Sequence, residues 1–242
     1  MGVDMTRTSR LPIASGRGLA CGLALVLCFG VGGCERHGCS ETPWEVSCAR
    51  RLQALADGIS DYRDAHGECP PYIVDDSGNK HSWRILIASY VWEDCVDSSQ
   101  IIEKFDYRYD EPWDSEHNVS VLLQAPFSDY RCPADVAAWS KEAQLDHTSY
   151  LMLVRPADDG ARPLPPDAVL IVESSGCGIP VAEPRDIDWE SLWTGDSPYG
   201  PGKLNSEHPG VIKALRMDGT VIDIPKNLDR ESLKKLLQGG NE

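Results

Sequence analysis

Apolar residues that recur at helical spacing after position 43 constrain this fold more than any other feature of the sequence. Three or four positions separate each from the next, so they line one stripe of an α-helix. The stripe consists of Cys48, Leu52, Leu55, Ile59 and Tyr62. Thr42-Pro43-Trp44-Glu45 has the pattern of a capping box, and Gly67 ends the periodicity. The sequence predicts a helix over 43–66 that buries this stripe against another element.

The strongest β-hairpin signal surrounds Asp218-Gly219. Two runs rich in aliphatic residues, 211–217 and 220–224, flank this dipeptide, which is typical of a two-residue type I′ turn. Such a turn pairs Met217 with Thr220 and places four apolar side chains on one face of the hairpin. They are Leu215, Met217, Ile222 and Ile224. We expect this face to be turned toward the core.

The rest of the chain adds strands and short helices to these elements. Runs of β-forming residues at 149–154 and 168–173 predict two core strands. Ser82 predicts the cap of a short helix that runs to Tyr90, and the segment 103–135 is expected to be irregular. A last helix is predicted over 229–239, with Asp229 as its cap. Together the elements predict an α+β domain over 42–242.

The charge of the chain excludes some classes of partner. Its 242 residues include 23 basic and 38 acidic side chains, which gives a formal net charge of −15. Because so acidic a surface repels phosphate backbones, we expect no nucleic acid among the partners. The 41% hydrophobic content is sufficient for a packed core.

The first 33 residues have the pattern of an export signal. Three arginines precede an uncharged apolar run over 18–33, which spans roughly 24 Å, less than the ~30 Å core of a bilayer. The run ends on Val31-Gly32-Gly33-Cys34, which resembles the bacterial lipobox, so Cys34 is the expected lipidation site. Two alternatives are an uncleaved membrane anchor and cleavage at another position. We expect 34–41 to be a tether that holds the exported domain at the inner or outer membrane of a cell envelope, on the periplasmic side or at the cell surface.

Six of the nine cysteines lie outside the signal and the expected lipidation site. An even number of cysteines in an oxidising compartment predicts up to three disulfides, with fifteen possible pairings. The six are Cys39, Cys48, Cys69, Cys95, Cys132 and Cys177. No Cys-x-x-Cys pair occurs, so the sequence predicts neither a zinc site nor a thioredoxin-like redox centre.

A longer motif begins at His208, from which nine residues, with Gly210 among them, lead to Asp218-Gly219. It resembles the motif of a bacterial family of prepilin-type proteins that is named for a His, nine arbitrary residues and Asp-Gly. Other stretches agree in order and spacing, so that the resemblance covers about residues 45–240. They are 48–52, 81–84, 111–114, 132–133, 148–150 and 183–186, together with Asn118.

This resemblance implies a type IV pilin-like fold, with a long N-terminal amphipathic helix on an antiparallel sheet and a loop-rich C-terminal half. It also implies a pseudopilin-related, non-catalytic module whose partners are envelope proteins, for example those of a secretion or pilus-like assembly. The chain departs from the family at its leader. Ser15-Gly16-Arg17-Gly18-Leu19 stands where prepilin leaders have Gly, an aromatic or similar residue and then Thr-Leu-Val-Glu.

The resemblance also orders the cysteine pairs. Cys69 and Cys95 stand where the family often has other residues, which suggests a bond between them. Cys48 and Cys132 fall within matching stretches and form a second expected pair. Cys39 and Cys177 are left over, either as a third bond or as free thiols.

His208 and Asp218 are a tempting catalytic pair, but a straight strand of ten residues would separate them by about 33 Å. We therefore expect structural roles for both. Asp218 and Gly219 suit the turn, and His208 suits the loop that leads into the strand. The sequence predicts no catalytic residue.

Two acidic clusters leave an alternative function open. Oxygen-rich loops outside the cytoplasm can hold Ca²⁺, although no spacing here matches a defined calcium loop. With a stacking platform of Trp113, Trp189 and Trp193, the same carboxylates would suit an envelope carbohydrate-binding protein or hydrolase. The clusters are Asp106, Asp110, Glu111, Asp114 and Glu116, and then Glu183, Asp186 and Asp188.

Overall fold

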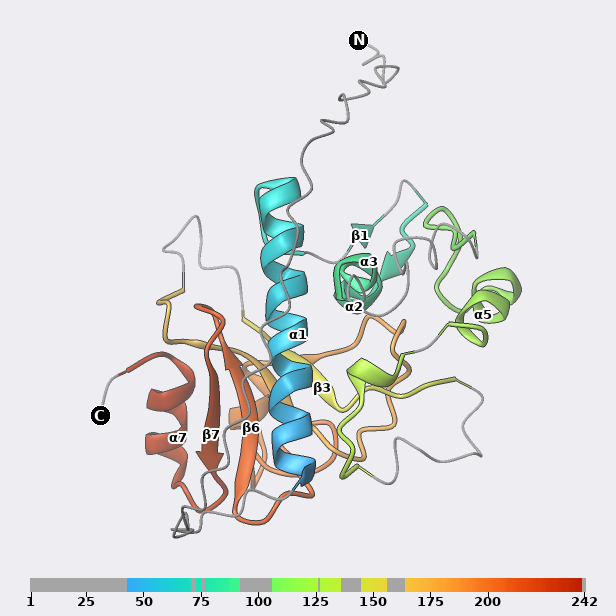
Figure 1. Ribbon diagram of the computed structural model, residues 1–242. Coiled ribbons are helices and arrows are strands. Elements are labelled where there is room, and N and C mark those ends of the chain that lie inside the picture. Colours follow the sequence, from blue (N-terminus) through green and yellow to red (C-terminus); the bar gives the residue numbers. More distant parts are fainter. Residues whose placement is uncertain are drawn as a thin grey trace, which may run out of the picture. The chain divides into compact units, whose positions relative to one another are not determined.

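The computed structural model describes residues 43–70, 73–74, 77–91, 106–125, 127–135, 145–155 and 164–240 (Figure 1). All of them belong to one compact unit, Ser40–Glu242. The unit combines several helices with a five-stranded mixed sheet, so the predicted α+β class is confirmed.

The five-stranded sheet has the order β5-β3-β4-β6-β7. Neighbouring strands are antiparallel except β3 and β5, which are parallel. The strands are β3 (Tyr150–Val154), β4 (Val169–Glu173), β5 (Ile187–Asp188), β6 (Val211–Arg216) and β7 (Val221–Pro225). β3 and β4 occupy the two runs predicted as core strands. A separate two-stranded ladder pairs β1 (Ile73–Val74) with β2 (Lys80–His81).

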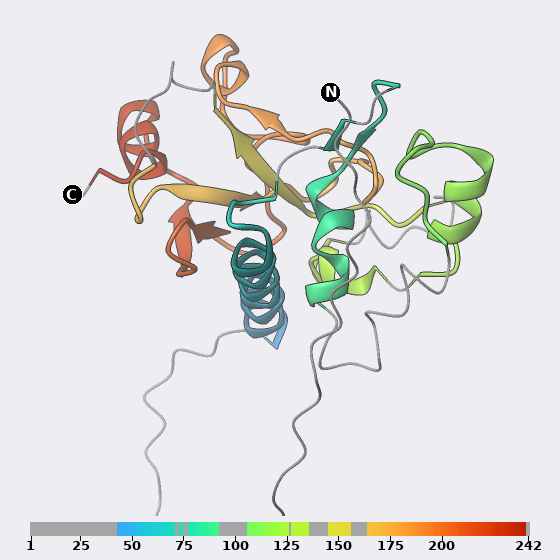
Figure 2. The same cartoon turned by 90° about the horizontal axis from the view of Figure 1, so that it is seen from above.

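Helix α1 (Pro43–His66) has the predicted bounds and lies across one face of the sheet (Figure 1, Figure 2). The predicted stripe is buried along its whole length, from Cys48 to Tyr62. It shares one core cluster with Tyr150 of β3, Ile171 of β4 and Leu215 of β6. The amphipathic pattern thus finds its partner in the central strands.

Helix α7 (Arg230–Leu237) covers the opposite face of the sheet (Figure 2). Leu233 and Leu237 share a second core cluster with Ile212 and Ile224 of the hairpin. Asp229 caps the helix as predicted, because its Oδ1 accepts hydrogen bonds from the N–H groups of the second and third residues after it, both at 3.0 Å. The sheet therefore has an apolar core on each side.

The β6–β7 hairpin forms, but its predicted register is wrong by one residue. Ile212 pairs with Ile224, and the N–H of Arg216 donates to the carbonyl of Thr220 at 2.9 Å. The loop therefore has three residues, 217–219, in place of the predicted two. Gly219 takes a φ of 86°, the left-handed position with which such three-residue loops end.

The shift moves hairpin side chains to the other face of the sheet. Ile222 and Ile224 pack in the second cluster, on the side of α7, while Leu215 stays on the side of α1. Contacts with a distant segment of the chain cause this change of register. The N–H groups of Met217 and Asp218 donate to the carbonyls of Ala168 and Pro166, both at 2.9 Å, so the loop continues the ladder to the segment before β4.

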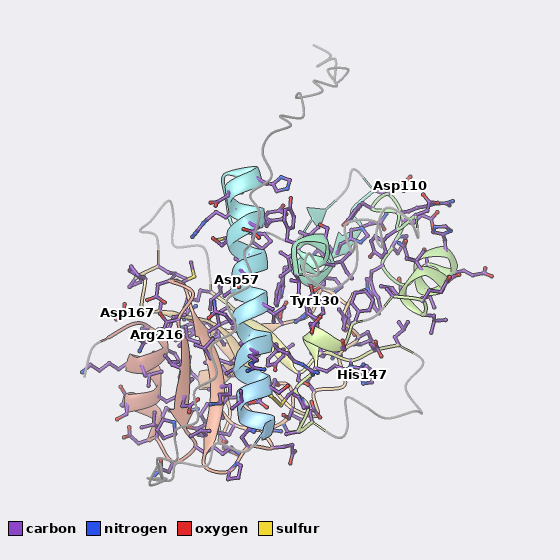
Figure 3. All side chains as sticks on the ribbon, in the orientation of Figure 1. Asp57, Asp110, Tyr130, His147, Asp167 and Arg216 are labelled. Carbon is purple, nitrogen blue, oxygen red and sulfur yellow. A yellow bond between two sulfur atoms is a disulfide. The ribbon has the colours of Figure 1, made fainter. Side chains whose placement is uncertain are left out.

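The segment after Ser82 forms two short helices in place of the single predicted one. Ser82 caps α2 (Trp83–Leu86) as predicted, and α3 (Ala88–Val91) follows after Ile87. Part of the segment predicted as irregular forms α5 (Glu116–Leu122) and η1 (Ser128–Tyr130). Tyr130, labelled in Figure 3, places η1 beside α1. A further short helix, α6 (Ser191–Thr194), follows β5.

Several sequence predictions fall outside the described residues. They are the signal or anchor over 1–33, the tether over 34–41, lipidation of Cys34, the cap at Thr42, and the thiols of Cys39 and Cys95. Among the helices that the structure describes, none combines the length and apolar character needed to cross a bilayer.

Candidate functional site: a buried cysteine, histidine and glutamate cluster

Four chemically active side chains meet in the interior between α1 and the sheet. Cys48 comes from α1, Cys132 from the loop after η1, Glu173 from the end of β4, and His208 from the loop before β6. We refer to these residues as the Cys/His/Glu cluster. Each is at most 1% exposed, and their ligand atoms all lie within 4.8 Å of one another. Nothing comparable occurs elsewhere in the described ranges.

A disulfide joins Cys48 to Cys132, with their Cα atoms 5.5 Å apart. This is the second of the pairs that the family resemblance suggests. The bond ties α1 to the loop after η1 across a sequence separation of 84 residues. Closing a loop of this length constrains the unfolded chain by about 4.5 kcal/mol in the chain-entropy treatment.

His208 lies against this disulfide. Its Nε2 is 3.3 Å from Cys132 Sγ and 3.7 Å from Glu173 Oε1. The backbone around His208 is also fixed, because its N–H donates to Ser206 Oγ at 3.0 Å and its carbonyl accepts from Lys226 Nζ at 2.6 Å. The expected loop position is right, but sequence reasoning missed these chemical partners.

Glu173 is a buried carboxyl at the end of an apolar strand, where the sequence pattern gives no signal for it. Its Oε1 accepts from Ser175 Oγ at 3.2 Å, and its Oε2 accepts from the N–H of Lys213 at 3.3 Å. Burial raises the pKa of Glu173 to about 7, although hydrogen bonds, the largest from Ser206, act in the opposite direction. Near neutral pH this group can therefore hold or release a proton.

His208 and Asp218 do not meet, since they lie before and after β6. Asp218 is exposed in the hairpin loop, where its Oδ1 accepts from the N–H of Thr220 at 2.9 Å. Hydrogen bonds from Thr220 lower the pKa of Asp218. Gly210 and Gly219 both have positive φ, 74° and 86°. Apart from His208, the motif thus shapes the two ends of a strand.

Other stretches of the family resemblance meet at a buried ion pair. Arg84 Nη2 lies 2.5 Å from Asp186 Oδ1, and both side chains are fully buried. Arg84 also donates to the carbonyl of Tyr150, at 3.2 Å from Nε and 3.1 Å from Nη2. Trp83 Nε1 donates to Asp186 Oδ2 at 3.1 Å. The stretches 81–84, 148–150 and 183–186 therefore form one polar network in the core.

The remaining described cysteines are not bonded. Cys69 is a free, exposed thiol, and its expected partner Cys95 lies outside the described residues. Cys69 follows the end of α1, outside the core that brings Cys48 and Cys132 together. Cys177 is free as well, and its thiol donates to the carbonyl of Thr148 at 3.1 Å. Burial raises the pKa of Cys177, which keeps the thiol protonated.

Several carboxylates of the two acidic clusters have partners nearby in the sequence. Arg108 pairs with Asp106 and Glu111 at 3.3 and 2.8 Å. Glu183 pairs with Arg185, and Asp188 accepts from the N–H of Ser191 at 2.8 Å. In the described parts of the chain, these carboxylates form no group close enough to hold an ion. The geometry of the described carboxylates therefore adds no support to the alternative of a Ca²⁺ loop.

The three tryptophans do not build a single stacking platform. Trp113 packs against the core cluster on the α1 side, whereas Trp189 and Trp193 belong to the second cluster. Trp189 is 6% exposed, and the Arg155 guanidinium lies 4.7 Å from its ring centroid. An exposed sugar-binding surface made of all three rings is therefore absent.

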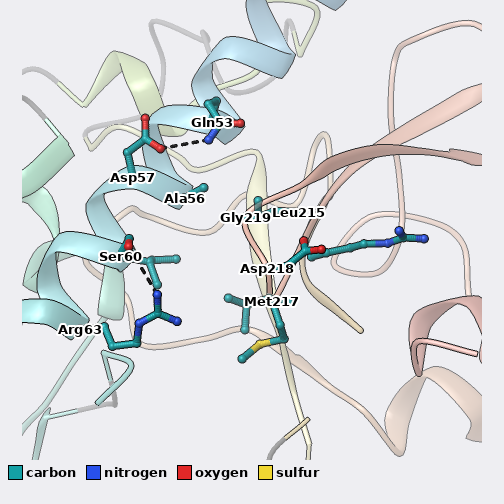
Figure 4. A pocket seen from close by; sticks show the side chains of 12 residues that line it. Gln53, Ala56, Asp57, Ser60, Arg63, Leu215, Met217, Asp218 and Gly219 are labelled. Atoms are coloured by element: carbon teal, nitrogen blue, oxygen red, sulfur yellow. Dashed lines mark hydrogen bonds between the residues drawn. The ribbon is translucent and has the colours of Figure 1, made fainter. Parts of the chain in front are cut away.

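A shallow groove of about 180 Å³ runs between α1 and the hairpin loop (Figure 4). On the helix side, Gln53 Nε2 donates to Asp57 Oδ1 at 3.0 Å, and Arg63 Nη2 donates to Ser60 Oγ at 3.5 Å. Asp218 and its neighbours in the loop line the opposite wall. Polar and apolar residues both line the groove, and none of the Cys/His/Glu cluster does.

No family model, curated protein or solved structure matches this chain. The chemistry of the cluster follows from its own atoms. In the disulfide form it has one imidazole nitrogen and one carboxyl next to a buried S–S bond, which links α1 to the loop after η1. In a dithiol form it would present two sulfurs, one imidazole nitrogen and one carboxylate around a common point.

Proposed function

We propose that this protein is a non-catalytic, pilin-like interaction module of a bacterial cell envelope, held at a membrane through Cys34. The family resemblance over about 45–240 supports the proposal. So does the arrangement of the domain, in which one long amphipathic helix lies across antiparallel strands and a short helix covers the other face.

The observation that carries the proposal is the burial of three side chains that lie in stretches of the family resemblance. The side chains of His208, Arg84 and Asp186 are at most 1% exposed and contact other parts of the protein. Residues that perform catalysis must reach a substrate, whereas residues that set a scaffold do not. The stretches that define the resemblance therefore suit a scaffold that presents a surface.

The Cys48–Cys132 bond favours an exported location for this scaffold. Structural disulfides persist in oxidising compartments and are rare where thiol reductants dominate. Together with the apolar run and Val31-Gly32-Gly33-Cys34, it supports export and anchoring.

Mass spectrometry of the mature protein tests the anchor. We expect an N-terminus at Cys34 that carries a diacylglyceryl group, and we expect Cys34→Ser to leave the protein in its unprocessed form. Cys69→Ser is the matched control, because Cys69 is an exposed thiol with no expected role in processing. A soluble mature product that begins at another residue would contradict lipid anchoring.

Photo-crosslinking in intact cells tests the interaction role. A photoreactive amino acid is placed at the exposed position of Asp57 on α1, and as a control at the exposed Glu231 on α7. We expect a discrete adduct with an envelope protein from the α1 position and none from α7. Absence of adducts from α1, or equal labelling from both positions, would count against an interaction module that uses the α1 face.

A further inference from the structure

We propose that Cys48, Cys132, His208 and Glu173 form a tetrahedral Zn²⁺ site when the Cys48–Cys132 disulfide is reduced. The site goes beyond the proposed function and does not depend on it. In the oxidised protein, the disulfide joins α1 to the loop after η1. In the reduced protein, a metal ion bound by all four residues would hold these segments together.

The geometry of the cluster fits a four-coordinate ion. With Zn–S bonds near 2.3 Å and Zn–N and Zn–O bonds near 2.1 Å, neighbouring ligand atoms of a tetrahedron lie about 3.4–3.8 Å apart. The distance from Cys132 Sγ to His208 Nε2 is 3.3 Å, and that from His208 Nε2 to Glu173 Oε1 is 3.7 Å. Once the S–S bond opens, the two sulfurs need to separate to a similar distance, and ligand atoms that lie up to 4.8 Å apart need to approach one another.

The donor set selects zinc among the common metal ions. Two thiolates and one imidazole are soft or borderline ligands, which suit Zn²⁺ and disfavour Ca²⁺ and Mg²⁺. All four residues are at most 1% exposed, which is typical of a closed structural site rather than of an open catalytic one. Glu173 is also oriented by hydrogen bonds from Ser175 and from the N–H of Lys213, which act as outer contacts.

Charge determines how the reduced cluster can lose its thiol protons. Without a metal, two thiols and a carboxyl buried at one point stay protonated, because two thiolates and a carboxylate there would repel one another strongly in a medium of low polarity. A divalent ion offsets most of the negative charge that deprotonation creates. Lys213, whose backbone N–H contacts Glu173, does not supply the counter-charge, because its Nζ is 2.7 Å from Asp223 Oδ1 on the neighbouring strand. The Nζ of Lys226 donates to the carbonyls of Ser206 and His208, both at 2.6 Å.

The conversion balances in two steps. A dithiol reductant transfers two electrons and two protons to the Cys48–Cys132 bond, which breaks into two thiols, while the reductant closes into its own disulfide. Zn²⁺ then displaces the two thiol protons to solvent and forms two Zn–S bonds. His208 Nε2 and a Glu173 oxygen each contribute a lone pair. Because the cluster is buried, we expect the ion to enter as the reduced chain folds.

A cobalt titration tests the proposal. The full chain is purified in detergent with only Cys48 and Cys132 retained and the other seven of its nine cysteines replaced by serine. It is reduced, unfolded and refolded with Co²⁺, which shows thiolate charge-transfer bands and intense visible bands in tetrahedral sites. We expect one Co²⁺ per chain, displaced by Zn²⁺, and none in the oxidised protein. The matched control retains only Cys69 and Cys177, and should show no such bands.

Variants at the other two ligands complete the test. His208→Ala and Glu173→Gln should each weaken Co²⁺ binding at least about tenfold. Bands that are equal in the control chain, or that neither variant changes, would overturn the site. If the reduced chain does not fold without metal, circular dichroism during a Zn²⁺ titration decides. The proposal then requires helix content to return at one equivalent, and its failure to return would overturn the proposal.

Discussion

At the scale of single residues, the core of this protein carries more polar chemistry than its sequence suggests. Four charged or titratable side chains are at most 1% exposed: those of Glu173, His208, Arg84 and Asp186. Each has specific partners, so the cost of removing it from water is partly offset. This cost is offset differently at the ion pair and at the cluster. Arg84 and Asp186 neutralise each other, whereas burial raises the pKa of Glu173 and so favours its neutral form.

The stability of the oxidised protein should therefore fall as the pH rises through the titration of Glu173. The pKa of this carboxyl is raised from 4.5 to about 7, so the folded state holds the proton more tightly than the unfolded chain. Its contribution is complete below pH 4.5 and is lost by about pH 7, a change of up to roughly 3 kcal/mol. Asp135 and His208 face the same carboxyl.

Urea unfolding at pH 4.5 and pH 8 measures this effect. Glu173→Gln keeps His208 and Asp135 in place, so the difference between parent and variant isolates the carboxyl. We expect the variant to gain stability relative to the parent on going to pH 8. The exposed Glu231→Gln is the control and should follow the parent at both values. A constant difference between parent and Glu173→Gln would contradict the raised pKa.

Loss of Arg84 should be far more costly than loss of an exposed arginine. Arg84→Met leaves Asp186 as a buried charge without its guanidinium partner, which costs about 3–5 kcal/mol of unfolding free energy. Arg108→Met breaks pairs whose side chains are partly exposed and should cost less than about 1 kcal/mol. Denaturant midpoints measure both. The double variant Arg84→Met/Asp186→Leu should be more stable than Arg84→Met alone, and the opposite order would contradict the unpaired-charge account.

At the scale of elements, the sequence predicts those parts in which one local pattern decides the outcome. Helix α1 has both predicted bounds, and Asp229 caps α7, because a periodic stripe and a cap are each encoded within a few residues. The β6–β7 register differs because contacts with the carbonyls of Ala168 and Pro166 favour a three-residue loop. The separation of α2 from α3 at Ile87 and the two-residue strand β5 are likewise not predicted, because such short segments show no periodic pattern in the sequence.

The packing of α1 is tested at the centre of its stripe. Leu55→Asp places an unpaired carboxylate in a fully buried position, and we expect a loss of about 4 kcal/mol or more. Arg50→Asp, on the exposed face of the same helix, should change stability by about 0.5 kcal/mol at most. Thermal melts compare the two. Equal melting temperatures for Leu55→Asp and the parent would mean that α1 does not pack on the sheet through this stripe.

At the scale of the whole molecule, the Cys/His/Glu cluster is a product of topology. Its four residues come from four separate segments, and 84 positions separate Cys48 from Cys132. The motif draws attention to His208, and the family resemblance to the two cysteines, but no local signal marks Glu173. Nor does any local spacing indicate that the four converge, because that depends on how α1 packs against the sheet. A search for local metal motifs fails for the same reason.

The last prediction concerns the Cys48–Cys132 disulfide, which links distant parts of the sequence. Peptide mapping without reduction should recover Cys48 linked to Cys132, with Cys69 alkylated as a free thiol. Replacing both linked cysteines by serine should lower the unfolding free energy by about 4.5 kcal/mol, because the unfolded chain regains the freedom of an 84-residue loop. The matched control, Cys69→Ser/Cys177→Ser, removes two unlinked thiols and should lose much less stability, since its unfolded state is unchanged. A Cys69–Cys132 linkage in the map, or equal losses in the two double variants, would contradict a closure of the fold through Cys48 and Cys132.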